Sequence, residues 1–332
     1  MGKGNVRIST NHLTLPTVDI GAPTVVQHYR LSFDPDASEN IPVPIDKNEI
    51  PKIDFTRWAE GLKKVQTEAM MSSEMDFPRC PIKIQEFFES VPEFKRTGDH
   101  SKRHVVAWAN VMAHVAQLTQ PNWASTIYAI AQVIRDVPCL VLTKKGGLQK
   151  PANKEQHWKF ARKLGILVGL HLTSKSDADY KRRITNSVVD YYFALSTLNV
   201  GDVKVWILAE IDGIYGDNLV EIKVKKHFSQ LDLCRAFFSA VPKIVYTNIR
   251  AIDIAAGGFP TPQRVKFEFG QTSKMINEEF LARGKNLIAE FMVCIFAYFE
   301  DHSACTSLFA KKKPDTLFFQ LEMPYGLKSG QN

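Results

Sequence analysis

Four charged residues near the middle of the chain have the types and spacing of a metal-dependent hydrolytic site: Glu210, Asp212, Glu221 and Lys223. Residues two apart on a β-strand share a face, so each of the two pairs lies on one face of its strand. If residues 216–218 form a hairpin turn, three carboxylates and one ammonium group converge. Because Mg²⁺ prefers carboxylate oxygens and substrate phosphates, the pattern predicts a divalent-cation site beside a phosphate.

The chemistry of such a site is hydrolysis of a phosphodiester or pyrophosphate bond. Mg²⁺ or Mn²⁺ held by carboxylates neutralises phosphoryl charge and activates water at neutral pH. Lys223 would then steer the phosphate or the attacking water, and Ile222 would add a backbone carbonyl ligand. The alternative is a pair of surface carboxylates on an edge strand, with Glu221 and Lys223 forming an ion pair. The apolar residues at 206–209 and 214–215 favour burial, and buried charges need partners or a metal.

Composition bounds the class of protein and the kind of partner. The chain has 332 residues, a net charge of +7 and 45% hydrophobic residues, which indicates a soluble globular protein with a large core. The basic excess fits an anionic partner such as nucleic acid, although many other proteins share it. We assign RNA-backbone contact to the Lys225 and Lys226 cluster because it adjoins the acidic residues. The remaining basic clusters, among them Lys181 with Arg182 and Arg183, are interpreted as solvated faces.

Cysteine usage and the start of the chain predict the cellular compartment. The five cysteines are scattered, odd in number and never spaced as Cys-x-x-Cys, which argues against a disulfide framework or a cysteine zinc site. The first residues lack an apolar secretory segment. The longest apolar run, at 287–299, is too short to span a bilayer, so no membrane partner is predicted. We expect the protein in the nucleus, the cytoplasm or both.

The elements that must position the four charged residues alternate between helices and strands. We predict helices at 55–71, 82–91, 102–118, 153–172, 231–241 and 275–299. We predict strands at 125–134, 137–143, 203–213, 218–226, 243–250, 263–269 and 316–323, and leave 187–198 open. The pattern favours an α+β fold with a mixed central sheet flanked by helices. Residues 1–24 are predicted to be an N-terminal arm, and residues 25–325 a single domain.

Several stretches in order resemble the DXO family of RNA decapping exoribonucleases, which have a PD-(D/E)xK nuclease-like core. The most specific are Glu210-x-Asp212, which resembles the family's "GE-x-D", and Glu221-Ile222-Lys223, which resembles its "E-[LVI]-K". The flanking matches are weak singly and stand in family order: 29–34 with Pro42 and Pro44, 53–55 with Gly61, 135–142, 241–245 and 258–261. The resemblance covers roughly residues 25–325.

The resemblance implies Mg²⁺-dependent attack on RNA 5′ ends. Family members remove incomplete or non-standard caps, including NAD caps, or release pyrophosphate, and some then degrade the RNA from 5′ to 3′. By resemblance, Glu210, Asp212 and Glu221 would be metal ligands, Ile222 a carbonyl ligand and Lys223 a catalytic phosphate contact.

Three positions depart from the family pattern. Gly169 stands where the family has a glutamate that helps hold a second metal, and no acid lies between Glu155 and Asp177. Ala109 stands where an arginine would contact the RNA 5′ end. Arg235 replaces a glutamine and is assigned, with the neighbouring lysines, to RNA binding. These departures predict activity that is weakened, altered in substrate, or lost.

The sequence therefore supports two hypotheses of different class. The favoured one is a metal-dependent hydrolase acting on RNA 5′ ends, because all of Glu210, Asp212, Glu221 and Lys223 are present. The alternative is a catalytically weakened or inactive RNA 5′-end-binding or regulatory protein, which Gly169 favours. A DNA endonuclease of the same superfamily would explain the acidic residues but not the flanking matches. The sequence indicates no particular protein partner.

Overall fold

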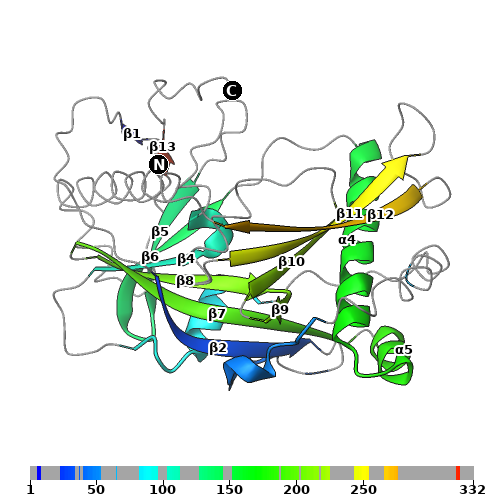
Figure 1. Ribbon diagram of the computed structural model, residues 1–332. Helices are drawn as coiled ribbons and strands as arrows, with labels where there is room; N and C mark the ends of the chain where they lie inside the picture. The colour runs from blue at the N-terminus through cyan, green and yellow to red at the C-terminus, as the bar shows by residue number, and fades with distance from the viewer. Residues whose placement is uncertain are drawn as a thin grey trace.

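The described part of the chain forms three β-sheets with helices packed on them (Figure 1). The computed structural model describes residues 6–8, 23–33, 37, 40–53, 65, 82–95, 103–112, 127–144, 152–186, 188–201, 203–216, 218–224, 243–253, 265–275 and 319–321. Within these segments, no helix has both the length and the apolar character needed to cross a membrane.

The largest sheet is mixed and has seven strands. In pairing order they are β3 (Val43–Ile45), β2 (Thr24–Phe33), β7 (Val189–Val200), β8 (Val203–Ile211), β4 (Arg103–Trp108), β6 (Val137–Lys144) and β5 (Ile127–Ile134). β4 runs parallel to both β8 and β6, whereas the other pairs are antiparallel. The segment at 187–198, left open by the sequence, is thus mostly strand β7.

A second sheet of four strands continues from the first. Its order is β12 (Val265–Met275), β11 (Lys243–Asp253), β10 (Asn218–Val224) and β9 (Gly213–Tyr215). β10 and β11 are parallel, and the remaining pairs are antiparallel. Two short strands, β1 (Val6–Ile8) and β13 (Phe319–Leu321), pair separately in parallel.

Four helices have defined bounds among the described residues. They are η1 (Lys47–Glu49), α2 (Ile84–Ser90), α4 (Ala152–Thr173) and α5 (Asp177–Thr185). α4 contacts α5 and β10, and Figure 1 shows it crossing the end of the strands. The helices predicted at 55–71, 231–241 and 275–299 lie almost entirely outside the described residues.

The helix predicted at 102–118 is wrong over its first half, because residues 103–108 form strand β4. β4 lies between two parallel neighbours, and Val105, Val106 and Ala107 are fully buried. A strand buried on both faces shows a continuous apolar run, which periodicity alone does not distinguish from a buried helix. Helical structure begins only at Ala109, directly after the strand.

One hydrophobic core joins the helices to the sheet. Phe87 and Phe88 of α2 and Leu167 of α4 pack in one cluster with Phe193 of β7 and Leu208 of β8. Phe87 meets Phe193 edge to face, with ring centroids 5.5 Å apart, a favourable geometry for aromatic pairs. The mixed sheet with its helices confirms the predicted α+β fold class. The division into an arm and a single domain stays a prediction.

Candidate functional site

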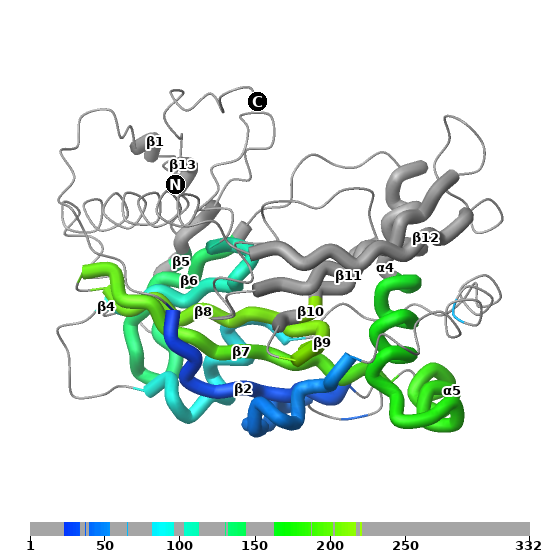
Figure 2. The backbone as a smooth tube through the Cα atoms, in the orientation of Figure 1, coloured from blue at the N-terminus to red at the C-terminus, as the bar shows by residue number. Residues whose placement is uncertain are grey.

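Glu210 and Asp212 lie where the chain passes from the seven-stranded sheet to the four-stranded sheet. Glu210 is the penultimate residue of β8 and pairs across the strands with Phe193 of β7. Asp212 is the single residue between β8 and β9, and both carboxylates are half-buried. The strand predicted at 203–213 therefore breaks at Asp212, because the chain changes its pairing partners there. Figure 2 traces this passage from β8 into β9.

The predicted hairpin is present and brings the second acidic pair toward the first. β9 and β10 pair antiparallel, with Gly213 opposite Val220, and the turn includes Gly216 in the left-handed conformation, with a φ of 58°. Asp212 and Glu221 directly flank the last pair of this register in the chain: Asp212 comes before Gly213, and Glu221 comes after Val220. β8 and β10 also contact each other. The backbone thus brings the two acidic segments to one place, as the sequence spacing predicts.

Glu221, Ile222 and Lys223 occupy the second half of β10. They stand in register with residues 246–248 of β11, whereas β9 pairs with β10 only as far as Val220. The side chains of these three residues lie outside what the structure describes. The assignment of Glu221 as a ligand and Lys223 as a phosphate contact therefore stays a prediction.

The remaining predicted RNA contacts fall beyond the end of β10. Lys225, Lys226 and Arg235 lie outside the described residues, and their assignment also stays a prediction. Among the side chains that the structure describes, no three acidic, histidine or cysteine groups lie close enough to hold a metal. Glu221 is not among those side chains. The donors at the site are carboxylates, which as hard oxygen ligands suit Mg²⁺ or Mn²⁺.

Helix α4 contacts β10, and its position 169 is a glycine, which offers no carboxylate. Gly169 lies in its C-terminal half, and a Cβ atom built there would meet nothing within 4 Å. Its flanking residues Val168 and Leu170 are buried and apolar. The glycine is therefore not required by close packing, and the position has room for a side chain.

The C-terminal ends of the parallel strands β4 and β8 lie side by side. Trp108 pairs with Leu208, and the next residue, Ala109, is buried. The Trp108 ring also packs against Phe193, with centroids 6.1 Å apart. This end of β4 therefore presents an apolar side chain where the family pattern would place an arginine.

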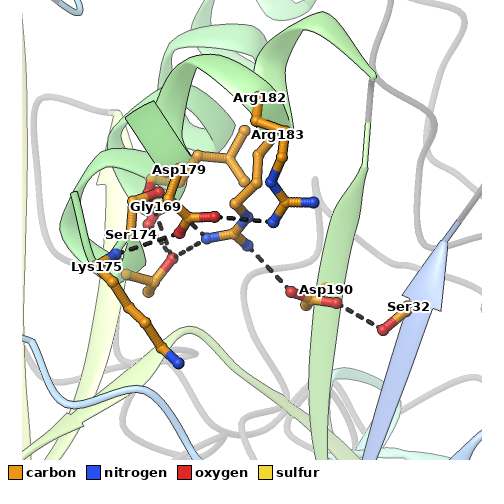
Figure 3. Close-up of polar contacts among 10 residues, drawn as sticks. Ser32, Gly169, Ser174, Lys175, Asp179, Arg182, Arg183 and Asp190 are labelled. Carbon is orange, nitrogen blue, oxygen red and sulfur yellow. Dashed lines mark hydrogen bonds and ion pairs between the residues drawn. The ribbon is translucent and has the colours of Figure 1, made fainter. Parts of the chain in front are cut away.

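One basic cluster does not form the solvated face that its sequence indicated. Arg182 is exposed and pairs with Asp179, but Arg183 is buried and pairs with Asp190 of β7 at 3.3 Å (Figure 3). Arg183 also donates to the hydroxyl of Thr173, which in turn donates to the carbonyl of Gly169. The interpretation failed because the partner of Arg183 comes from a strand rather than from its own helix. The arginine ties the end of α4 to the sheet.

Sequence reasoning also missed the contacts that hold β9. Gly213 follows Asp212 directly, and a Cβ atom there would lie 2.7 Å from two side-chain atoms of Ile53. Residues 51–53 run beside β9, and Ile214 exchanges two backbone hydrogen bonds with Pro51 and Ile53. A glycine inside an apolar strand often marks such a close approach, so the sequence did carry a signal.

Comparison with known proteins finds likeness in structure but not in sequence. No protein-family model matches the chain, and no curated protein sequence matches it. Rai1 of Candida albicans, solved in complex with pU5-Mn2+, aligns with a TM-score of 0.54 and 13% identity over 83% of both chains. Rai1 of Scheffersomyces stipitis, solved with (3'-NADP)+ and a calcium ion, gives a TM-score of 0.51 and 9% identity, covering 85% of this chain and 86% of its own.

A second structure of Scheffersomyces stipitis Rai1 gives a TM-score of 0.50 and 10% identity, covering 82% of this chain and 83% of that one. Rai1 proteins are DXO-family proteins, so these matches confirm the resemblance at the level of the fold. The chain has the fold of the Rai1 structures.

Proposed function

We propose that this protein is a metal-dependent hydrolase acting on RNA 5′ ends. The observation that carries the proposal is the β9–β10 pairing, whose last pair is Gly213 with Val220, the residues directly next to Asp212 and Glu221 in the chain. The fold supports it, because the similar Candida albicans Rai1 structure is a complex with pU5-Mn2+. The expected reactions are removal of incomplete or non-standard caps or of 5′ pyrophosphate, with 5′-to-3′ degradation as an additional activity.

The roles of the chain's own residues follow from their places in the strands. Glu210, Asp212 and Glu221 would hold Mg²⁺ or Mn²⁺, with the Ile222 carbonyl as a further ligand. When bound, the ion neutralises phosphoryl charge and lowers the pKa of water. Lys223, two residues after Glu221 on the same face of β10, would orient the phosphate of the RNA 5′ end.

The glycine at position 169 of α4 leads us to expect modest activity. α4 supplies no carboxylate at Gly169, so the proposed site holds one ion more readily than two. We further propose action in the nucleus, the cytoplasm or both.

A second candidate function is RNA 5′-end binding without turnover. Gly169 and Ala109 favour it, because neither position offers the charged side chain that the family pattern has. The two candidates differ in one measurable property, which is product release from a bound 5′-modified RNA.

The test uses the purified full chain with 5′-triphosphate RNA and NAD-capped RNA, in Mg²⁺ or Mn²⁺. We expect release of pyrophosphate or cap that is abolished by combining Glu210→Gln with Asp212→Asn. Asp136→Asn is the matched control, because Asp136 is exposed in the β5–β6 turn at a φ of 63°, a conformation that asparagine also tolerates. Equal turnover by wild type and the double variant would refute hydrolysis at this site. RNA binding by the wild type without release would support the second candidate.

A further inference from the structure

The short strand that follows Asp212, β9, is held on both sides by backbone pairing. On one side, Gly213 pairs with Val220, the residue that precedes Glu221 and is fully buried. On the other, Ile214 donates to the carbonyl of Pro51 at 2.9 Å and accepts from the backbone N–H of Ile53 at 2.8 Å. The short strand β9 is therefore clamped between β10 and residues 51–53.

The side chain of Ile53 fits against the bare backbone of Gly213. A Cβ atom at position 213 would lie 2.7 Å from both Cγ1 and Cδ1 of Ile53, and 3.0 Å from the carbonyl oxygen of Pro51. Ile53 is only 3% exposed and belongs to the main core. Because core side chains surround Ile53, it has little space to move away. Any side chain at position 213 would therefore push β9 and residues 51–53 apart.

Residues 51–53 are themselves fixed by the turn that precedes them. The Asp46 carboxylate accepts from the N–H of Asn48, and the Glu49 carboxylate accepts from the N–H of Asp46. This reciprocal capping box starts η1, after which Ile50 is buried. The placement of Ile53 thus rests on a locally rigid segment from a distant part of the sequence.

We propose that Ile53 is a positioning residue for the candidate site. By filling the space over Gly213, it sets the path of β9 and hence the place of Asp212 relative to Glu221. The consequence for metal binding rests on the proposed function, whereas the positioning itself does not. Its chemistry is steric, and no bond is made or broken.

The experiment is a rescue of Gly213→Ala. Hydrogen exchange, followed by mass spectrometry on peptides covering 205–224, reports the pairing of β9, and Mn²⁺ titration reports the site. We expect Gly213→Ala to speed exchange in these peptides and to weaken Mn²⁺ binding about tenfold, the usual effect of disturbing residues that orient ligands. Adding Ile53→Ala removes both crowding side-chain carbons, so the double variant should regain slow exchange and Mn²⁺ affinity.

The matched control replaces Ile53→Ala by Ile50→Ala in the Gly213→Ala background. Ile50 is about as buried as Ile53, at 2% exposure. The three atoms nearest to the added Cβ, however, belong to Ile53 and Pro51 and not to Ile50. This control should show no rescue. If Gly213→Ala alone does not fold, folding of the Gly213→Ala, Ile53→Ala double variant, measured by circular dichroism, also counts as rescue.

Two results would overturn the proposal. One is a Gly213→Ala variant whose hydrogen exchange is as slow as that of the wild type. The other is equal recovery of slow exchange when Ile53→Ala or Ile50→Ala is added to Gly213→Ala. Failure of the proposed function is recognised separately, in the wild-type background. If Glu210→Gln leaves Mn²⁺ binding unchanged, the proposed function fails. The rescue of slow hydrogen exchange can still be measured in that case, and it decides the positioning role.

Discussion

The two adjacent arginines of α5 should differ sharply in their importance for stability. The change is Arg183→Gln, with Arg182→Gln as its matched control one residue away. The Arg183 side chain is 9% exposed, and its partner Asp190 is 23% exposed; the Arg182 side chain is 64% exposed. The same substitution therefore removes a buried ion pair in one variant and a solvated one in the other.

The magnitude follows from what each substitution leaves behind. Breaking a fully buried ion pair by removing one partner costs about 3–5 kcal/mol, because the other charge stays buried. Asp190 is partly exposed and keeps its hydrogen bond from the Ser32 hydroxyl at 2.7 Å, so we expect about 2–3 kcal/mol. The Arg182–Asp179 pair spans one turn on the surface, so its loss should cost less than about 0.5 kcal/mol.

The assay is thermal unfolding followed by circular dichroism. At about 2.1 cal/mol/K per residue, the unfolding entropy of the 332-residue chain is roughly 0.7 kcal/mol/K, which converts the Arg183→Gln loss to a Tm decrease of about 3–4 °C. Arg182→Gln should lower the Tm by less than about 1 °C. Adding Asp190→Asn to Arg183→Gln should restore part of the loss, because no lone charge then remains buried.

The reasoning is refuted if the two arginine variants unfold at the same temperature. It is also refuted if Asp190→Asn adds its full cost to Arg183→Gln, because residues that form a pair must couple. Raising the salt concentration serves as a further check, since screening should affect the exposed pair more than the buried one.

Three further predictions concern single side chains. Gly169→Ala should stabilise the protein by about 0.5–1 kcal/mol in denaturant unfolding, because a helical glycine with open space around it carries an entropic cost. Gly169→Glu should raise the number of Mn²⁺ ions bound in calorimetric titration, and unchanged stoichiometry would contradict the expected room for a second ion. Burial raises the pKa of the Cys139 thiol to about 12, so iodoacetamide at pH 8 should label it only after unfolding. Rapid labelling of the native protein, seen by peptide mapping, would show that this thiol is accessible.

The strands around the site were predictable because their sequences obey local rules. β8 has the continuous apolar run of a strand buried on both faces, and β10 has the alternation of a strand near an edge. The turn between β9 and β10 contains Gly216, which adopts the left-handed conformation that favours glycine. Local periodicity and turn chemistry were therefore enough to predict the strands that carry Glu210 and Glu221 and the turn before β10, but not the break at Asp212.

Features that depend on distant partners were not predictable from the sequence. β4 was expected to be helical because its burial between β8 and β6 is a property of the sheet. Arg183 was expected to be solvated because Asp190 lies in a different element. α5 was missed because its nine residues are mostly charged and polar, although Ser176 caps it by accepting from the N–H of Asp179.

The position of Asp212 between two sheets explains both the strength and the weakness of the sequence prediction. A hairpin relates Glu221 to Asp212 by turn length, and the β9–β10 pairing extends to Gly213 and Val220, the residues next to them in the chain. The absolute place of Asp212, however, also depends on which chain lies on the other side of β9, and residues 51–53 are more than 150 positions away in the sequence. Spacing of acidic residues therefore predicts which groups meet, whereas we propose that the fit of Ile53 against Gly213 decides how closely they can meet. Since ligand placement within fractions of an ångström governs metal binding, a site with the right acids still depends on this apolar contact.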